Sequence, residues 1–161
     1  MKEGMPVTGR GSISGRRLAA AAAAVAALSL VLAACGGGGG TVKVGLQEWA
    51  IVPDAASISA GKVTFEATNN GPEDQHELVV FRTDLGPRDL PTNEDGSVDE
   101  EGAGVELIGE IEEFDVGGSE SATFDLPAGK YVLICNIVQT EADGTLEAHY
   151  KMGMATAFEV K

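Results

Sequence analysis

The sequence predicts an all-β domain, an antiparallel sandwich or barrel of seven or eight short strands. From Thr41 onward, short runs alternate apolar with polar residues, which is typical of half-buried strands. Clusters of Gly, Pro, Asn and Asp separate these runs, and no convincing long amphipathic helix is present. Repeated short strands with turns between them favour a sandwich or a barrel.

Residues 1–34 differ from this domain in composition. Basic residues, among them Arg16 and Arg17, precede an almost wholly apolar, alanine-rich run from Leu18 to Ala34. A basic segment followed by an apolar one is typical of a secretory signal peptide. A retained membrane anchor is the alternative, but about 17 residues is at the short end for spanning a bilayer. The paired arginines hint at twin-arginine export, although their flanking residues fit it poorly.

Cys35 directly follows the apolar run, in Leu32-Ala33-Ala34-Cys35, and five glycines follow it. This segment resembles the bacterial lipobox, in which the cysteine receives a diacylglyceryl group and becomes the mature N-terminus. The resemblance implies lipidation at Cys35 and export to the outer face of the cell membrane, where two acyl chains give stable anchoring. Residues 35–40 would then form the lipidated cysteine and a flexible glycine tether, ahead of a domain at 41–161.

The chain outside the leader is strongly acidic. Four of the 11 basic and one of the 25 acidic residues lie in residues 1–34, so the remainder carries a formal charge of −17. This charge argues against binding nucleic acid, because little here would neutralise phosphates. It favours a protein partner with a basic docking face, although solubility alone also explains many of these carboxylates. We expect a monomer.

The first half of the domain contains clear strand patterns. Val42, Val44 and Leu46 alternate with polar residues or glycine. Residues 63–68 alternate likewise and stop at the turn cluster Asn69-Asn70-Gly71-Pro72, after which an apolar run begins at His76. The strands expected here are 42–46, 49–52, a short edge piece at 57–61, 63–68 and 76–81.

Residues 83–107 are acidic, broken by Pro and Gly, and poor in apolar side chains. They predict a long surface excursion with a short helix near 97–102. The carboxylates suggest calcium, but the EF-hand spacing fails because Pro91 falls at the first ligand position and Gly102 at the last. The strands expected after this excursion are 108–116, 121–126, 131–137 and 155–160.

Soft metal donors are few and lie at predicted strand ends or in adjacent loops. Two imidazoles, one thiolate and a weak axial thioether are the donor set of a mononuclear type 1 copper site. If Cys35 carries lipid, the remaining thiol has no disulfide partner; a disulfide to Cys35 or an inert buried thiol are the alternatives. The donors after Cys35 are His76, Cys135, His149, Met152 and Met154.

Three separated segments resemble the plastocyanin/azurin family of cupredoxins. Residues Gly129 to Cys135 resemble the family's penultimate strand, His149 to Met154 match its His-x-x-x-Gly-Met ending, and Asn69 to His76 resemble its first copper loop. Over residues 41–161 the resemblance implies a Greek-key β-sandwich holding one copper ion. The ligands it implies are His76, Cys135 and His149 in the equatorial plane and Met154 as the axial ligand.

The chain departs from the family pattern in its loops. Thirteen residues separate Cys135 from His149, where small cupredoxins commonly use a few, so we expect an inserted loop at 138–148. Met152 competes as axial donor, although Gly153 directly before Met154 favours the latter.

A further departure is Glu77, which follows His76 where many relatives have Asn. The family's usual hydrogen bond near the thiolate is therefore absent or supplied by Asn136.

The resemblance implies a protein that is not an enzyme and that shuttles single electrons between partners at the outer face of the membrane. It also implies that His149 is the ligand nearest the surface, with Tyr150 and the 138–148 loop shaping the docking face. A copper-delivery lipoprotein and a metal-free adhesion module are alternative functions. A thiol hydrolase fits poorly, since no Gly-rich oxyanion segment accompanies Cys135, and two histidines are too few for a multicopper oxidase.

Overall fold

The structure, a computed structural model, describes residues 38–161. The signal peptide, the lipidation at Cys35 and the start of the glycine tether lie outside the described residues. Among residues 38–161, no helix is both long enough and apolar enough to cross a membrane.

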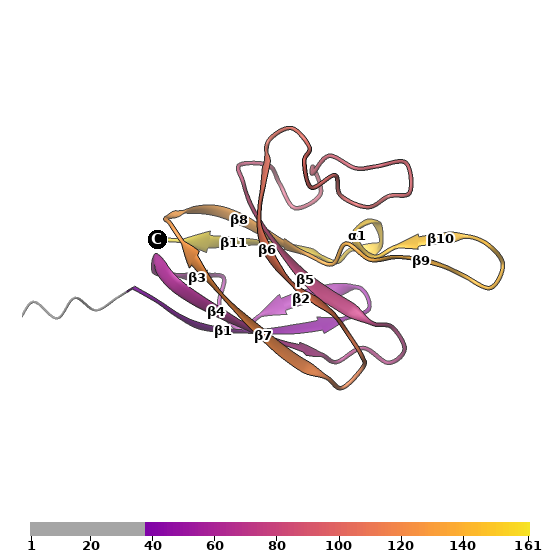
Figure 1. The fold of residues 1–161 in the computed structure, drawn as a ribbon, viewed down its shortest axis with the longest axis horizontal. Coiled ribbons are helices and arrows are strands. Elements are labelled where there is room, and N and C mark those ends of the chain that lie inside the picture. The colour runs from indigo at the N-terminus through magenta and orange to yellow at the C-terminus, as the bar shows by residue number, and fades with distance from the viewer. Residues whose placement is uncertain (1–37) are drawn as a thin grey trace, which may run out of the picture. The chain divides into compact units, whose positions relative to one another are not determined.

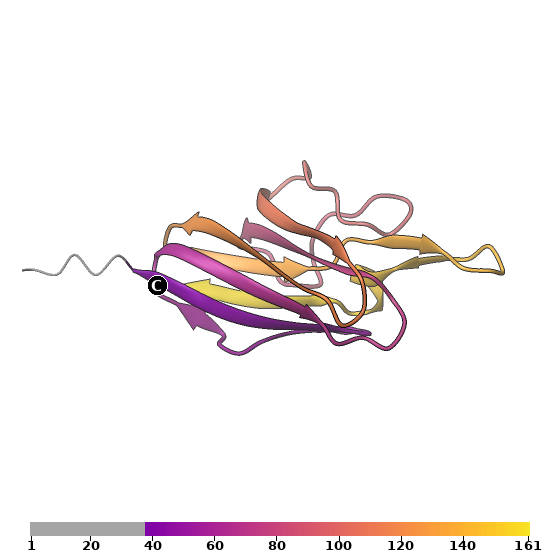
Figure 2. The same cartoon turned by 60° about the horizontal axis from the view of Figure 1, so that its bottom comes forward.

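Two β-sheets pack face to face as the two layers of a sandwich (Figures 1 and 2). The first sheet has the order β2-β1-β4-β7, and its strands are β1 (Gly39–Gln47), β2 (Ala50–Pro53), β4 (Gly61–Asn69) and β7 (Ser119–Leu126). The second has the order β3-β11-β8-β5-β6, and its strands are β3 (Ser57–Ile58), β5 (His76–Thr83), β6 (Val105–Phe114), β8 (Gly129–Ile134) and β11 (Ala155–Val160). The predicted sandwich is confirmed.

The strand pairing is mixed rather than wholly antiparallel. β1 pairs with β4 in parallel, and β3 pairs with β11 in parallel, whereas the remaining pairs within the two sheets are antiparallel. Non-local parallel pairing leaves no local sequence signal, because the alternation of apolar residues is the same in either direction.

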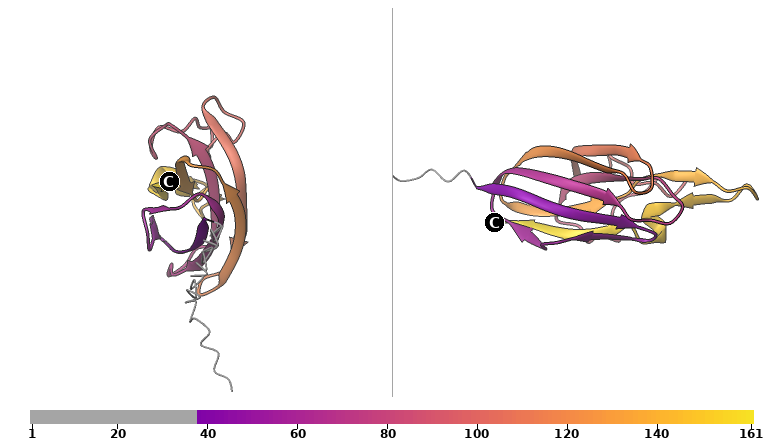
Figure 3. Two further views of the ribbon diagram at one scale, coloured as in Figure 1. Left: turned by 90° about the vertical axis from the view of Figure 1, so that its left-hand side faces the viewer. Right: turned by 90° about the horizontal axis from the view of Figure 1, so that it is seen from below.

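The main core lies between the two sheets, and Figure 3 shows the sandwich from one end and from below. Alternate residues of β1 and β4 point into it, among them the fully buried Val42, Val44 and Phe65. The Phe65 ring meets Phe158 of β11 edge-on, with 5.5 Å between ring centroids. Burying apolar surface of this kind stabilises the fold by roughly 25 cal/mol per Å², so the alternation seen in the sequence sets which face of each strand is inside.

Two of the six residues assigned to the tether segment belong to the first sheet. Gly39 and Gly40 pair in register with Lys62 and Val63 of β4. Gly39 has φ +92°, and the backbone of Lys62 occupies the space that a Cβ atom would need. Glycine is therefore required at position 39 by close backbone approach.

The excursion between β5 and β6 is folded against the outside of the second sheet (Figure 1). Its Leu90 and Val98 are buried in a second apolar cluster with residues of β5 and β8 and with Tyr150. The predicted helix near 97–102 is wrong: within the described residues this stretch forms turns and a β-bridge between Thr92 and Val98. Two isolated apolar residues show no periodicity, so the sequence alone gave no indication of this packing.

The loop between Cys135 and His149 contains a two-stranded hairpin of β9 (Val138–Thr140) and β10 (Leu146–Ala148). The hairpin projects beyond one end of the sandwich (Figures 1 and 2). It is followed by a single-turn helix, α1 (His149–Met152), which ends at Gly153 with φ +137°. An insertion was expected at 138–148, whereas its hairpin and the helix after it were not.

Candidate metal site

Three donor atoms converge inside the domain. The Cys135 sulfur Sγ lies 3.3 Å from His149 Nδ1 and 4.0 Å from His76 Nδ1, and the two Nδ1 atoms are 3.3 Å apart. All three side chains are fully buried. His76 and His149 are 73 residues apart in the chain, so the fold assembles the three predicted ligands from separate segments.

Sheet pairing explains how these residues meet. His76 begins β5, Cys135 directly follows β8, and these two strands are antiparallel neighbours, with Val79 opposite Ile134. The end of one strand therefore lies beside the beginning of the other. His149 opens α1, where its backbone N–H donates to the carbonyl of Ile137 at 2.9 Å. This bond joins the two ends of the inserted loop and so places His149 near Cys135.

The two methionines have different environments. Met154 is fully buried in the same core cluster as Cys135, and its carbonyl accepts a 3.1 Å hydrogen bond from the Cys135 backbone N–H. Met152, on α1, is 46% exposed. The structure thus places the Met154 residue beside the thiol and leaves the Met152 side chain partly in solvent.

Burial determines the protonation of the three donors. It raises the pKa of the Cys135 thiol to about 12, against the lowering effect of hydrogen bonds with the Glu77 and Ile137 backbone. Burial also lowers the pKa of both His76 and His149, so both imidazoles are neutral at neutral pH. A buried thiol between neutral imidazoles ionises readily only when a cation offsets its charge. Sulfur with two imidazole nitrogens is a donor set that suits copper.

The His149 ring lies beneath the turn between β1 and β2. The Trp49 ring contacts it edge-on, with centroids 5.0 Å apart. His149 is fully buried, as are His76, Cys135 and Met154, so exposure does not distinguish the ligands and its position nearest the surface stays a prediction. Tyr150 is also buried, beneath the excursion, and does not shape an exposed face.

Glu77 and Asn136 connect the site to its surroundings. One Glu77 carboxylate oxygen accepts a 2.8 Å hydrogen bond from the Asn136 backbone N–H. The Asn136 side chain bonds instead to the excursion: its Oδ1 accepts from Val98 N at 2.6 Å, and its Nδ2 donates to Val98 O and Glu100 Oε1, each at 3.1 Å. Asn136 therefore holds the excursion rather than facing the thiol.

Acidic side chains approach the outer side of both imidazoles. Glu48 Oε1 lies 3.8 Å from His76 Nε2, and Asp74 and Glu147 each place an oxygen within 4.8 Å of a His149 ring nitrogen. Sequence reasoning missed Glu48 and Trp49 as site residues. The chain's single tryptophan, at the start of an expected strand, was the available indication for Trp49, whereas nothing local distinguishes Glu48.

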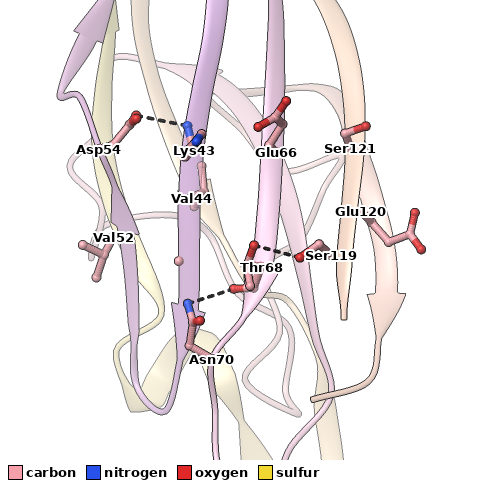
Figure 4. A pocket seen from close by; sticks show the side chains of 11 residues that line it. Lys43, Val44, Val52, Asp54, Glu66, Thr68, Asn70, Ser119, Glu120 and Ser121 are labelled. Atoms are coloured by element: carbon pink, nitrogen blue, oxygen red, sulfur yellow. Dashed lines mark hydrogen bonds between the residues drawn. The ribbon is translucent and has the colours of Figure 1, made fainter. Parts of the chain in front are cut away.

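A shallow groove crosses the outer face of the first sheet, away from the ligand residues (Figure 4). Thr68 and Ser119 are hydrogen-bonded there through their hydroxyl groups at 2.9 Å. None of the four predicted ligands lines this groove.

No family model matches the chain, and no curated protein matches its sequence. Its structure is similar to reduced auracyanin from the photosynthetic bacterium Roseiflexus castenholzii, at 22% identity and a TM-score of 0.50, over 75% of this chain and 96% of that one. It is also similar to auracyanin A, a "blue" copper protein from Chloroflexus aurantiacus, at 23% identity and a TM-score of 0.50, over 77% of this chain and all of that one. These likenesses confirm the predicted cupredoxin fold.

Proposed function

We propose that this chain binds one copper ion and carries single electrons between redox partners. The observation that carries the proposal is the convergence of the Cys135 sulfur with the Nδ1 atoms of His76 and His149, at 3.3–4.0 Å in a buried cluster. Bound copper supplies a one-electron couple between Cu(II) and Cu(I). The ligands lie at the ends of packed strands, which limits how far they move between the two oxidation states.

Met154 is the proposed axial ligand. It is buried beside Cys135, and its backbone is fixed by the hydrogen bond to Cys135 N–H. Met152 has no such contact and is partly exposed. Binding of the metal requires the Cys135 thiol to lose its proton, which the cation makes favourable despite a pKa of about 12 in its absence.

Electron exit in this proposal proceeds past Trp49. His149 is buried, and the partly buried Trp49 ring lies against it. The nearby exposed residues Glu73 and Glu141 are acidic, which suits a redox partner with a basic docking face. Steering by these charges makes association faster at low salt than at high salt.

The proposed location is the outer face of the cell membrane, with a lipid anchor at Cys35. Support comes from the leader and the lipobox-like segment of the sequence. β1 begins at the end of the sandwich opposite α1 and the ligands (Figure 1). An anchor preceding β1 therefore leaves the ligand end free to meet a partner. A monomer without catalytic activity is sufficient for this role.

Copper delivery is the second candidate function, and the exposed thioether of Met152 favours it. A soft sulfur donor at the surface, two residues from Met154, is a suitable first ligand for passing Cu(I) to an acceptor. The two functions differ in whether the bound copper passes to another protein. A carrier of cargo transfers its Cu(I) to an acceptor protein, and Met152→Leu slows that transfer, whereas an electron carrier retains its metal through repeated redox cycles.

Metal analysis with an optical spectrum tests the copper proposal. The purified chain loaded with Cu(II) should bind one ion and show an intense visible charge-transfer band from thiolate to copper. Cys135→Ser should abolish the band, while Met152→Leu should leave it nearly unchanged. A band that persists in Cys135→Ser, or no band in the loaded wild-type chain, contradicts the proposal.

A further inference from the structure

We infer that Glu48 is a positioning residue for the His76 ligand: its carboxylate accepts the Nε2–H of His76, and its charge favours oxidised over reduced copper. This inference rests on the proposed function, since it concerns the same site. Glu48 lies in the turn between β1 and β2, 28 residues before His76.

The Glu48 carboxylate is held against the loop that leads into His76. Its Oε1 accepts hydrogen bonds from the backbone N–H groups of Asp74 at 2.9 Å and Glu73 at 3.3 Å. The side chain is 12% exposed. These two backbone N–H donors stabilise the ionised form of the carboxylate. Glu48 therefore presents a negative charge to His76.

Two buried atoms lack a partner at this contact. Glu48 Oε2 and His76 Nε2 are both buried and make no hydrogen bond with the described part of the chain. Oε1 of the same carboxylate is 3.8 Å from that nitrogen. A buried donor left unpaired costs stability, and a movement of about 1 Å would give ordinary hydrogen-bond geometry. A small movement therefore suffices to form a hydrogen bond between Glu48 and His76.

Metal binding determines which ring nitrogen of His76 carries the proton and donates to Glu48. His76 Nδ1 faces Cys135 and His149, so when Nδ1 binds the metal, Nε2 carries the ring proton. Ligating histidines usually donate this second N–H to an outer partner, which fixes the tautomer and the ring orientation. Glu48 is the carboxylate placed to accept it.

Gly71 provides the space for the carboxylate. A Cβ atom at this position would lie 2.6 Å from Glu48 Oε1 and 2.5 Å from Oε2. Gly71 is buried, and its N–H donates to Asn69 Oδ1 at 2.9 Å, which fixes the loop. The turn predicted as part of the first copper loop therefore also forms the seat of the Glu48 carboxylate.

The carboxylates near His149 are engaged differently. Gln139 Nε2 donates to Asp74 Oδ1 at 2.9 Å and to Glu147 Oε1 at 3.2 Å. Glu48 is distinguished by a buried, unpartnered oxygen. A fixed negative charge there stabilises the more positive oxidised site over the reduced one.

The test measures the reduction potential of the copper-loaded chain with Glu48→Gln, which keeps the size and an acceptor oxygen but removes the charge. We expect the ratio of Cu(II) to Cu(I) affinity to fall by about tenfold, equivalent to a rise of ~59 mV for a one-electron couple. Glu73→Gln is the matched control, because it removes the same charge from an exposed neighbouring residue. A Glu48→Gln potential no different from that of the control overturns the inference.

A second measurement needs no copper. In the metal-free chain, nitrogen chemical shifts of the His76 ring should report predominantly the Nε2–H tautomer, and Glu48→Ala should shift the population toward Nδ1–H. Gly71→Ala should have the same effect by displacing the carboxylate. An unchanged tautomer in a folded Glu48→Ala chain contradicts the contact. Failure of the chain to bind copper overturns the proposed function and leaves this measurement valid for the contact.

Discussion

Tyr150→Phe should weaken the attachment of the excursion to the ligand loop. Tyr150 follows the ligand His149, and its hydroxyl oxygen accepts a 3.1 Å hydrogen bond from the Leu90 backbone N–H, a contact buried within the second apolar cluster. The substitution keeps the ring and leaves that N–H without a partner. An unsatisfied buried donor costs about 1–3 kcal/mol, and a domain of this size loses roughly 4 °C in Tm per kcal/mol. Thermal unfolding of the metal-free chain should therefore show a decrease of about 4–12 °C.

Tyr131→Phe is the matched control for this experiment. The Tyr131 hydroxyl donates to the carbonyl of Pro127 at 2.7 Å, but Pro127 is exposed. Water can replace the lost donor, so the expected cost is below about 1 kcal/mol. Amide hydrogen exchange should show faster exchange at Leu90 in Tyr150→Phe and not in Tyr131→Phe. Equal destabilisation by the two substitutions, or unchanged exchange at Leu90, would refute the reasoning.

Three further predictions concern other parts of the domain. In the metal-free chain, burial raises the pKa of Glu77 to about 7 from 4.5, so the stabilising contribution of this residue is present below pH 4.5 and is lost as the pH rises through 7. Glu77→Gln should therefore raise the free energy of urea unfolding at pH 8 but not at pH 4. Equal effects at the two pH values would contradict this. Trp49 is the only tryptophan and contacts His149, so Cu(II) loading should quench tryptophan fluorescence more than Zn²⁺ loading does; equal emission would argue against copper at this site. Phe65→Ala should cost about 3–5 kcal/mol in urea unfolding, because Phe65 is fully buried between the sheets; a cost below about 1 kcal/mol would show that the core repacks.

The donor set and the strand pattern were both predictable. Alternation in residues such as Val42, Val44 and Leu46 sets the buried face of a strand, and such patterns predicted most of the larger strands at nearly their observed positions. His76, Cys135 and His149 were identifiable because each donor type is rare in the chain and lies at a strand end. Their convergence in the structure agrees with that reasoning.

Contacts between distant segments were not predictable in the same way. Leu90 and Val98 are single apolar residues in an acidic segment, and their burial depends on the outer faces of β5 and β8. α1 is a single turn, too short for a helical period to register in the sequence. Local patterns contain no information about a surface that another segment supplies.

The sequence by itself determined an all-β sandwich or barrel and the types of donor available to a metal, because strand alternation and side-chain chemistry are local properties; the cupredoxin fold followed from the resemblance of three segments to that family. The tertiary structure decided what surrounds those donors. It buried His149 against Trp49, buried Met154 in the same core cluster as Cys135 while leaving Met152 partly exposed, and brought the Glu48 carboxylate to His76. The physical reason is that burial and electrostatic environment depend on segments far apart in the chain, which only the packing of the two sheets and their loops brings together.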